Sequence, residues 1–310
     1  MRLNEYNVKV MIGIFSYNEG ESPRAMYDEI KKQCLSSHLS CSIVLLDESD
    51  DPRSKRVIEG IKREGVRNLI SGKSRKGKVH GYNQLFKEFL SSGNDVLMHF
   101  DSDLSLSHEA VFLMTKSILG GYDIVSGISK PLSQNLLQRV LSVMQLPHIW
   151  MRESGNFNYP GVGHSGGYSR RAVKNINVIP ETGINEEIFV LISAFKYRLK
   201  IGVVKGAECF YRPPGTLEDY ISSNKRVVGR IKSLEPSVST HEPDQILLLN
   251  YTIKNIYSRP PINMIVGAVR SDPIASLFLP YIFIIRFWVH RFSKPFTQNI
   301  WDRISSTKDI

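Results

Sequence analysis

Short apolar runs alternate with helix-patterned stretches through the first hundred residues. The runs typical of buried strands are residues 8–15, 42–46, 66–70 and 96–100. The stretches with helical spacing between them are 23–35, 57–64 and 79–90. Because strand, polar loop and helix repeat in this order, the pattern predicts parallel βαβ units, in which helices cover both faces of a sheet. The predicted fold class is therefore α/β.

The pattern continues beyond residue 103 with longer elements. It predicts helices at 110–119, 135–150 and 186–197, and strands at 124–128 and 201–204. Near residue 213 the chain changes to basic clusters and to apolar segments interrupted by proline and arginine. We therefore predict one α/β domain over 1–212, with halves at about 1–104 and 105–212, and a basic, apolar C-terminal extension over 213–310.

Polar residues follow the predicted strands of the first half. Ser16-Tyr17-Asn18-Glu19 follows the first strand, Asp47 begins an acidic loop after the second, and a basic loop at 73–78 follows the third. In open α/β sheets, ligands bind at the carboxyl ends of parallel strands. These loops therefore predict one polar edge that carries the chemistry of the protein.

The fourth strand ends in Asp101-Ser102-Asp103. Two carboxylates one residue apart can both bind one hard cation, and oxygen ligands suit Mg²⁺ or Mn²⁺. An Asx-turn that closes the strand, with both aspartates in solvent, is the structural alternative. Asp101 and Asp103 are thus candidate metal ligands.

The net charge and the cysteine content indicate which classes of partner the protein binds and in which compartment it acts. The net charge of +10 and the pI of about 9.4 favour anionic partners: nucleic acid, acidic lipid or phosphorylated substrates. The basic residues lie beside carboxylate-bearing loops, which would repel phosphate unless a metal is present, so we do not expect nucleic acid as a partner. Cys34, Cys41 and Cys209 do not have metal-site spacing, which predicts reduced thiols in a cytoplasmic protein. No apolar run reaches the roughly 18 residues of a membrane-spanning helix, and we expect no signal peptide.

Four motifs occur in order on the predicted elements. They are Phe-Ser-Tyr-Asn-Glu at 15–19, Leu-Asp-Glu-Ser-Asp-Asp-Pro at 46–52, Arg-Lys-Gly-Lys-Val-His-Gly-Tyr-Asn at 75–83 and Asp-Ser-Asp at 101–103. Together they resemble the family 2 glycosyltransferases of the GT-A fold, over about residues 8–230. The second motif most resembles the membrane-associated branch, from which Glu48 and Asp50 are departures.

This resemblance implies a nucleotide-diphosphate sugar as donor and Mn²⁺ or Mg²⁺ as cofactor, held by Asp101 and Asp103. It assigns 1–104 to the donor and 105–212 to the acceptor, a hydroxyl of a lipid-linked molecule or a glycan. The residues that it assigns to the nucleotide sugar are Ser16, Tyr17, Asn18, Glu19, Asp47, Lys78, Asn83, Asp101, Ser102 and Arg226. Loop carboxylates also cap helices, so Glu19 fits either role, and Lys78 fits either an anion site at a helix start or a solvated basic loop.

Asn185-Glu186-Glu187 matches the position of the acidic pair that carries the general base in the resembling enzymes. By that match Glu187 is the candidate base, and Glu186 is the next candidate. A carboxylate in the first turn of a helix is kept ionised by the helix dipole, which suits proton abstraction. The same position is also a frequent helix stabiliser.

Two further segments bear on the acceptor and on processivity. The glycine-rich segment 161–167 lies where the family shapes the acceptor side, and its His164 fits an exposed histidine in a tight turn. Lys225, Arg226 and Arg230 are candidate diphosphate or lipid-phosphate contacts. The Gln-x-x-Arg-Trp motif of processive relatives is absent there, which disfavours polymer synthesis.

The stretch 274–292 mixes aromatic and aliphatic residues with Arg286 and Arg291. This composition predicts a helix in the interface of an anionic membrane, whereas the alternative is a helix that covers the core of the domain itself. The sequence therefore predicts a metal-dependent, inverting glycosyltransferase, peripheral or monotopic at the cytoplasmic face of the cell membrane. The competing interpretations are a sugar-phosphate nucleotidyltransferase and a non-catalytic basic protein that binds membranes or nucleic acid.

Overall fold

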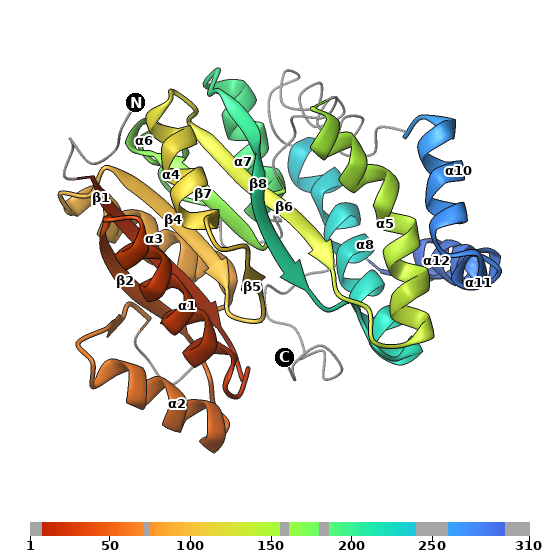
Figure 1. Ribbon diagram of the computed structural model, residues 1–310, viewed down its shortest axis with the longest axis horizontal. Helices are drawn as coiled ribbons and strands as arrows, with labels where there is room; N and C mark the ends of the chain where they lie inside the picture. Colours follow the sequence, from red (N-terminus) through yellow and green to blue (C-terminus); the bar gives the residue numbers. More distant parts are fainter. Residues whose placement is uncertain (1–7, 71–74, 156–160, 180–185, 240–259, 295–310) are drawn as a thin grey trace.

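An eight-stranded sheet forms the centre of the computed structural model (Figure 1), which describes residues 8–70, 75–155, 161–179, 186–239 and 260–294. The strand order is β3-β2-β1-β4-β7-β6-β8-β5. The strands are β1 (Lys9–Ser16), β2 (Ser40–Asp47), β3 (Arg67–Asn68), β4 (Val96–Asp101), β5 (Ser105–Leu106), β6 (Ile124–Pro131), β7 (Ser165–Ser169) and β8 (Ile201–Tyr211). The predicted α/β fold class is confirmed.

The first half of the sheet is parallel, as the alternation of strands and helices predicts. β1 pairs in parallel with β2 and β4, and β2 pairs in parallel with β3. The glycine-rich segment, for which no strand is expected from the sequence, contributes β7, which runs antiparallel between β4 and β6. This strand was not predicted because it contains Gly166 and Gly167, whereas strand prediction depends on β-branched and aromatic residues.

Helices cover both faces of the sheet. They are α1 (Ser22–Ser36), α2 (Pro52–Lys62), α3 (Lys78–Ser91), α4 (Ala110–Leu119), α5 (Leu136–Ser154), α6 (Arg170–Ile176), α7 (Glu186–Lys196), α8 (Leu217–Ser239), α10 (Ile262–Ser271), α11 (Pro273–Ser276) and α12 (Leu279–Phe292). Alternate residues of β1 point to opposite faces: Ile12 and Ile14 join the core under α1 and α4, whereas Met11 and Phe15 join the core under α3, α6 and α7.

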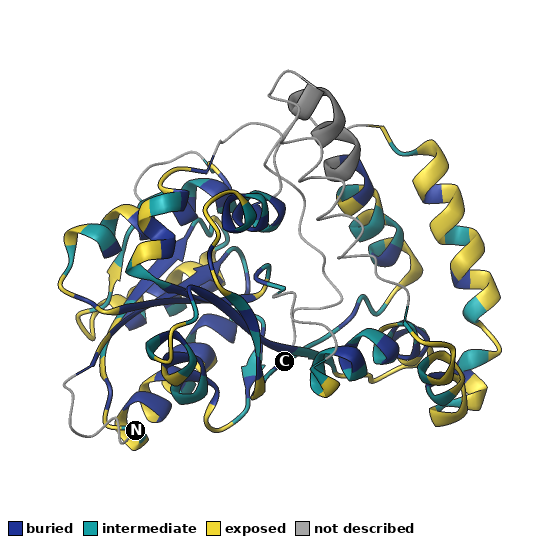
Figure 2. Cartoon of the chain, turned by 90° about the horizontal axis from the view of Figure 1, so that it is seen from above, coloured by how far each residue is buried: buried dark blue, intermediate teal, exposed yellow. Residues whose placement is uncertain are grey.

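A third apolar cluster joins α5 to the C-terminal helices. Val140 and Val143 of α5 pack with Tyr220 of α8, Ala268 of α10 and Ile282 of α12. Outside this cluster, most residues of the helices at the right of Figure 2 are exposed to solvent. The segment predicted as an extension is therefore docked on the α/β domain through α5. The boundaries at 104 and 212 stay predictions.

The prediction that all cysteines are reduced is wrong. Cys34 near the end of α1 and Cys41 in β2 form a disulfide, and Cys209 is free and buried. The short turn between the helix and the strand brings the two residues together, since the Leu39 N–H donates to the Cys34 carbonyl over 3.0 Å. The number and the spacing of the cysteines do not predict this pairing, because it depends on how the chain turns between α1 and β2.

Two helical glycines should respond oppositely to alanine. A Cβ on Gly81 of α3 would lie 2.6 Å from Cε1 of Phe15, whereas a Cβ on Gly60 of α2 meets nothing within 4 Å. We expect Gly60→Ala to raise the free energy of unfolding by about 0.5–1 kcal/mol through helix propensity. Gly81→Ala should lower it by about 1–3 kcal/mol, because overpacking outweighs propensity. Urea unfolding measures both, and an equal response of the two variants would contradict the packing at Gly81.

Candidate active site

Three strands of the parallel half end side by side. In the register of the sheet, Ser16 of β1 lies beside Asp47 of β2, and Phe15 lies beside Asp101 of β4. The Ser102 N–H donates to the Phe15 carbonyl over 2.9 Å, which keeps the chain against β1 beyond the strand end. The structure therefore brings the predicted donor-side loops to one edge.

Asp101 lies between a lysine and a histidine that come from other parts of the chain. Lys78 Nζ donates to its Oδ1 over 2.6 Å, and His164 Nδ1 lies 3.2 Å from its Oδ2. The Asp101 N–H donates to the His164 carbonyl over 2.9 Å. Burial alone would raise the pKa of Asp101, but the charge of Lys78 and the contact with His164 lower it well below its usual value. Asp101 is therefore ionised at neutral pH.

His164 lies in a turn and its side chain is 51% exposed, as the sequence predicts, but it also makes contacts that the sequence did not predict. Its ring stacks on Tyr211 of β8, with centroids 5.6 Å apart, while its Nδ1 faces Asp101. Burial lowers the pKa of His164, but the hydrogen bond and charge of Asp101, with a smaller contribution from the charge of Asp103, raise it overall. The glycine-rich segment gave no signal of this contact, because it arises from the antiparallel placement of β7 beside β4.

Lys78 begins α3, and a departure from the family motif shapes the turn before it. Glu48 accepts from the backbone N–H groups of Lys76 over 2.6 Å and of Gly77 over 2.9 Å. Gly77 has φ of 89°, in the left-handed region that favours glycine. Lys78 Nζ then reaches both Asp101 and the Gly163 carbonyl, the latter over 2.6 Å. Glu48 thus holds the turn that aims Lys78 at the strand end.

Two buried side chains, His99 and Tyr82, contact the backbone of the loop at 162–164. Neither was predicted as a site residue from the sequence. His99 Nε2 lies 2.9 Å from the Val162 carbonyl and 2.7 Å from Tyr82 Oη, and Tyr82 also donates to that carbonyl over 3.3 Å. A carbonyl only accepts, so His99 carries its proton on Nε2. Burial, with the nearby charge of Lys78, lowers the pKa of His99 to about 3, which keeps the ring neutral.

Glu187 faces the same loop from the start of α7. A Cβ on Gly163 would lie 2.9 Å from Glu187 Oε2, so the carboxylate packs where only a glycine leaves room. Burial raises the pKa of Glu187, and the positive charges of His164 and Arg152 offset only part of this rise. Glu186 is buried beside it. A carboxylate with a raised pKa beside Lys78 and His164 is suited to accept a proton.

Asn18 joins the first loop to the second. Its Oδ1 accepts from the N–H groups of Asp50 over 2.9 Å and of Asp51 over 3.1 Å, and its Nδ2 donates to Asp50 Oδ1 over 2.5 Å. Its φ of 55° lies in the left-handed region, which asparagine tolerates better than most residues. Ser49 links the Asn18 N–H, over 2.8 Å, to Asp47 Oδ1, over 2.6 Å. Asn18 therefore shapes the donor-side loops.

The remaining predicted donor residues divide into those at the edge and those elsewhere. Asp47, Ser16, Glu19 and Ser102 are buried at or beside the strand ends, and burial raises the pKa of Asp47. Tyr17 carries the Arg75 guanidinium 3.5 Å above its ring. These residues stay the proposed donor side.

The other two predicted donor residues, Asn83 and Arg226, lie on the helices α3 and α8. The Asn83 amide donates to the Ile179 carbonyl over 2.9 Å and accepts from the Ile179 N–H over 2.8 Å. It therefore fixes the chain at Ile179, and its donor contact stays a prediction. Arg226 lies on α8, which packs against α12. Its donor contact stays a prediction.

Asp101 and Asp103 fit a hard divalent cation by donor chemistry. Both are partly buried: Asp101 is the last residue of β4, and Asp103 lies two residues beyond it. Their oxygens are the ligands that Mg²⁺ and Mn²⁺ accept. In the described part of the chain, no group of three or more His, Cys, Asp and Glu side chains forms a metal site. Two carboxylates alone match a cation that takes its other ligands from substrate phosphate and water.

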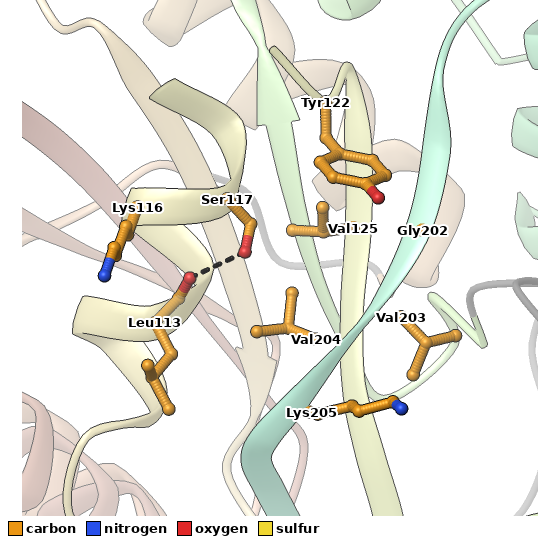
Figure 3. A pocket seen from close by; sticks show the side chains of 9 residues that line it. All are labelled: Leu113, Lys116, Ser117, Tyr122, Val125, Gly202, Val203, Val204 and Lys205. Carbon is orange, nitrogen blue, oxygen red and sulfur yellow. Dashed lines mark hydrogen bonds between the residues drawn. The ribbon is translucent and has the colours of Figure 1, made fainter. Parts of the chain in front are cut away.

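A separate cavity of about 360 Å³ lies between α4 and β8 (Figure 3). Lys116, Tyr122 and Lys205 line it, together with Leu113, Ser117, Val125, Gly202, Val203 and Val204. None of the predicted site residues lines this cavity. The cluster around Asp101 is therefore the candidate site.

Histidine side-chain NMR should separate the two site histidines. We expect the His99 signals to stay constant between pH 8 and pH 5, because its pKa is about 3. His164 should titrate above the ordinary value of 6.5, and Asp101→Asn should move that midpoint down. Since the raised pKa belongs to the folded state, the contact stabilises the protein at low pH and the stabilisation is lost as pH rises through it. A His99 signal that titrates in this range would contradict its buried position.

The fold can be compared with known proteins once this geometry is described. No protein-family model and no curated protein matches the chain. The mannosyltransferase PcManGT from Pyrobaculum calidifontis, in complex with GDP-Man and Mn²⁺, matches with a TM-score of 0.58 and 14% identity, over 92% of this chain and 84% of that one. Glucosyl-3-phosphoglycerate synthase from Mycobacterium tuberculosis, with Mn²⁺, UDP-Glc and phosphoglyceric acid, matches with a TM-score of 0.51 and 16% identity, over 75% and 81% of the two chains. The chain has the GT-A fold of these nucleotide-sugar transferases, as predicted.

Proposed function

We propose that the protein is a glycosyltransferase that moves a sugar from a nucleotide-diphosphate sugar to an acceptor hydroxyl. The observation that carries this proposal is the convergence of Asp101, Lys78, His164 and Glu187 at the end of β4 in a GT-A fold. The complexes of PcManGT with GDP-Man and of the synthase with UDP-Glc support a nucleotide sugar as donor.

The donor lies, in this proposal, along the edge formed by β1, β2 and β4. Asp47 and Glu19 accept hydrogen bonds from the nucleoside, and Lys78 pairs with a phosphate oxygen. Asp101 and Asp103 hold Mn²⁺ or Mg²⁺, as the Mn²⁺ in both related structures supports. The bound cation supplies neutralising charge for the diphosphate leaving group.

Glu187 acts as the general base of an inverting, single displacement. It removes the acceptor hydroxyl proton while that oxygen bonds to the anomeric carbon and the bond from this carbon to the diphosphate breaks. The raised pKa of Glu187, caused by burial, gives the carboxylate the proton affinity that this step needs. Gly163 leaves the space in which the carboxylate lies.

The C-terminal helices suggest where the acceptor is found. They carry a C-terminal apolar surface, formed by the exposed side chains of Ile262, Ile265, Val266, Val269, Ile274, Leu277, Phe278, Tyr281, Phe283, Ile284, Phe287, Trp288 and Phe292. Leu277, Tyr281 and Phe287 are 78%, 74% and 73% exposed. Patches of this kind mark interaction sites in soluble proteins.

Basic residues accompany this surface. Arg270, Arg286, Arg291 and Lys294 are exposed, and the acidic residue of 260–294, Asp272, is paired with Arg139 over 2.7 Å. Aromatic and basic side chains together suit an anionic membrane interface. The sequence left open whether this helix lies on a membrane or covers the core of the domain. In α12, the face with Ile282 and Val289 is buried against the domain, and the opposite face is free for a membrane.

We therefore place the protein peripherally on a membrane, with a lipid-linked or glycan hydroxyl as acceptor. Among the described residues, no helix has the length and apolar character needed to cross a bilayer. The Cys34–Cys41 disulfide removes the cysteine argument for a cytoplasmic location. The basic residues favour the cytoplasmic leaflet instead, because that leaflet carries the anionic lipids.

Asp101→Asn and Asp103→Asn should each abolish metal-dependent nucleotide binding. In a thermal-shift screen of UDP, GDP and their sugars, we expect one nucleotide with Mn²⁺ to raise the Tm of the parent by about 5 °C at 100 times its Kd. Both variants should lose this shift because each removes one carboxylate charge. Asp95→Asn, at the opposite edge of the sheet, serves as control. A full shift in either site variant would contradict the metal assignment.

Glu187→Gln should keep donor binding and lose transfer by about two to four orders of magnitude, because the amide cannot accept the proton. In the parent, the rate should fall as the pH decreases through the raised pKa of Glu187, and the variant should lack this dependence. Glu109→Gln, also at a helix start, is the matched control. Unchanged turnover in Glu187→Gln would make it a helix stabiliser only.

The double variant Phe287→Ser/Trp288→Ser should reduce binding to anionic vesicles by roughly tenfold or more, since each aromatic side chain contributes about 1.5–3 kcal/mol when fully buried. Leu35→Ser/Val178→Ser removes two exposed apolar side chains elsewhere and should bind as the parent does. Vesicle co-sedimentation measures this, and high salt should weaken the binding without eliminating it. Equal binding of both double variants would exclude the C-terminal apolar surface as the membrane contact.

A further inference from the structure

Lys78 and Asp101 form a nearly buried ion pair at the proposed cation site. Their side chains are 16% and 19% exposed, and Nζ lies 2.6 Å from Oδ1. His164 faces the other oxygen, at 3.2 Å. Both carboxylate oxygens of Asp101 are therefore engaged by groups that carry or can carry positive charge.

This arrangement opposes a divalent cation that approaches alone. The cation would need the same carboxylate oxygens and would lie beside the Lys78 ammonium. Repulsion between like charges is weakly screened at a site this buried. Two protein carboxylates are also few ligands for Mg²⁺ or Mn²⁺ without a substrate.

A diphosphate changes this balance because it gives Lys78 another anionic partner. Lys78 is the first residue of α3, where the helix dipole and free N–H groups favour phosphate. The ammonium ends a flexible four-carbon stem, so it can turn from Asp101 to a phosphate oxygen while the helix stays in place. Asp101 then regains an oxygen for the cation.

We infer that Lys78 is an internal counter-ion that keeps the cation site closed until a nucleoside diphosphate binds. This inference rests on the proposed function, since it takes the nucleoside diphosphate as ligand. It makes cation and nucleotide binding mutually dependent: each strengthens the other by the same factor, as linkage requires.

The test is calorimetric titration of Mn²⁺ into the full chain, with and without UDP or GDP. Without nucleotide, Lys78→Gln should bind Mn²⁺ roughly tenfold more tightly than the parent. With the nucleotide that binds, the parent should gain roughly tenfold or more in Mn²⁺ affinity, and the variant should gain less. Lys76→Gln, which removes an exposed charge two residues away, should behave as the parent does.

Lys78→Met provides a second neutral variant if Lys78→Gln does not fold, with circular dichroism as the check. Nucleotide-free Mn²⁺ affinity that is the same in the parent and in the folded neutral variant would overturn the inference. Failure of every protein to bind UDP or GDP would instead refute the proposed function, because the nucleotide-free comparison does not involve the nucleotide.

Discussion

The ionised carboxylate of Asp101 is the charge around which the site is arranged. Lys78 comes to it from the start of α3, and His164 comes from the turn before β7. Each contact comes from a different part of the fold, so the charge of the carboxylate is compensated only when the sheet is assembled. A buried carboxylate without these partners would be costly, which ties the geometry of the site to the stability of the strand end.

The loop at 162–164 connects this charge to the chemistry. Its carbonyl groups accept from Lys78 and from the buried His99–Tyr82 pair, and its Gly163 gives room to the Glu187 carboxylate. Because one short loop contacts both the donor-side lysine and the candidate base, a shift of the loop would disturb both. His99 and Tyr82, which contact this loop through the Val162 carbonyl, therefore help to fix the geometry of the site from within the core.

The sequence predicted the parallel half and the strand ends well, since apolar runs and polar loops are local signals. It identified Asp101, Lys78 and Glu187, which the structure brings together. It did not predict β7, because glycines lack strand propensity. It placed His164 correctly in an exposed turn but did not predict its contact with Asp101. The hydrogen bonds of the Asn83 amide with Ile179 were also not predicted, because they join positions 96 residues apart. Such long-range contacts leave no periodic pattern in a sequence.

Paramagnetic broadening by Mn²⁺ tests most directly whether Asp101 marks the cation and nucleotide site. His164 lies 3.2 Å from Asp101, whereas His38 precedes β2, an 8-residue strand of about 26 Å whose far end is Asp47. With UDP or GDP present, Mn²⁺ should broaden the side-chain NMR signals of His164 strongly and those of His38 weakly, and Asp101→Asn should remove the difference. Equal broadening of both histidines, or none at His164, would contradict a cation and nucleotide site at the end of β4.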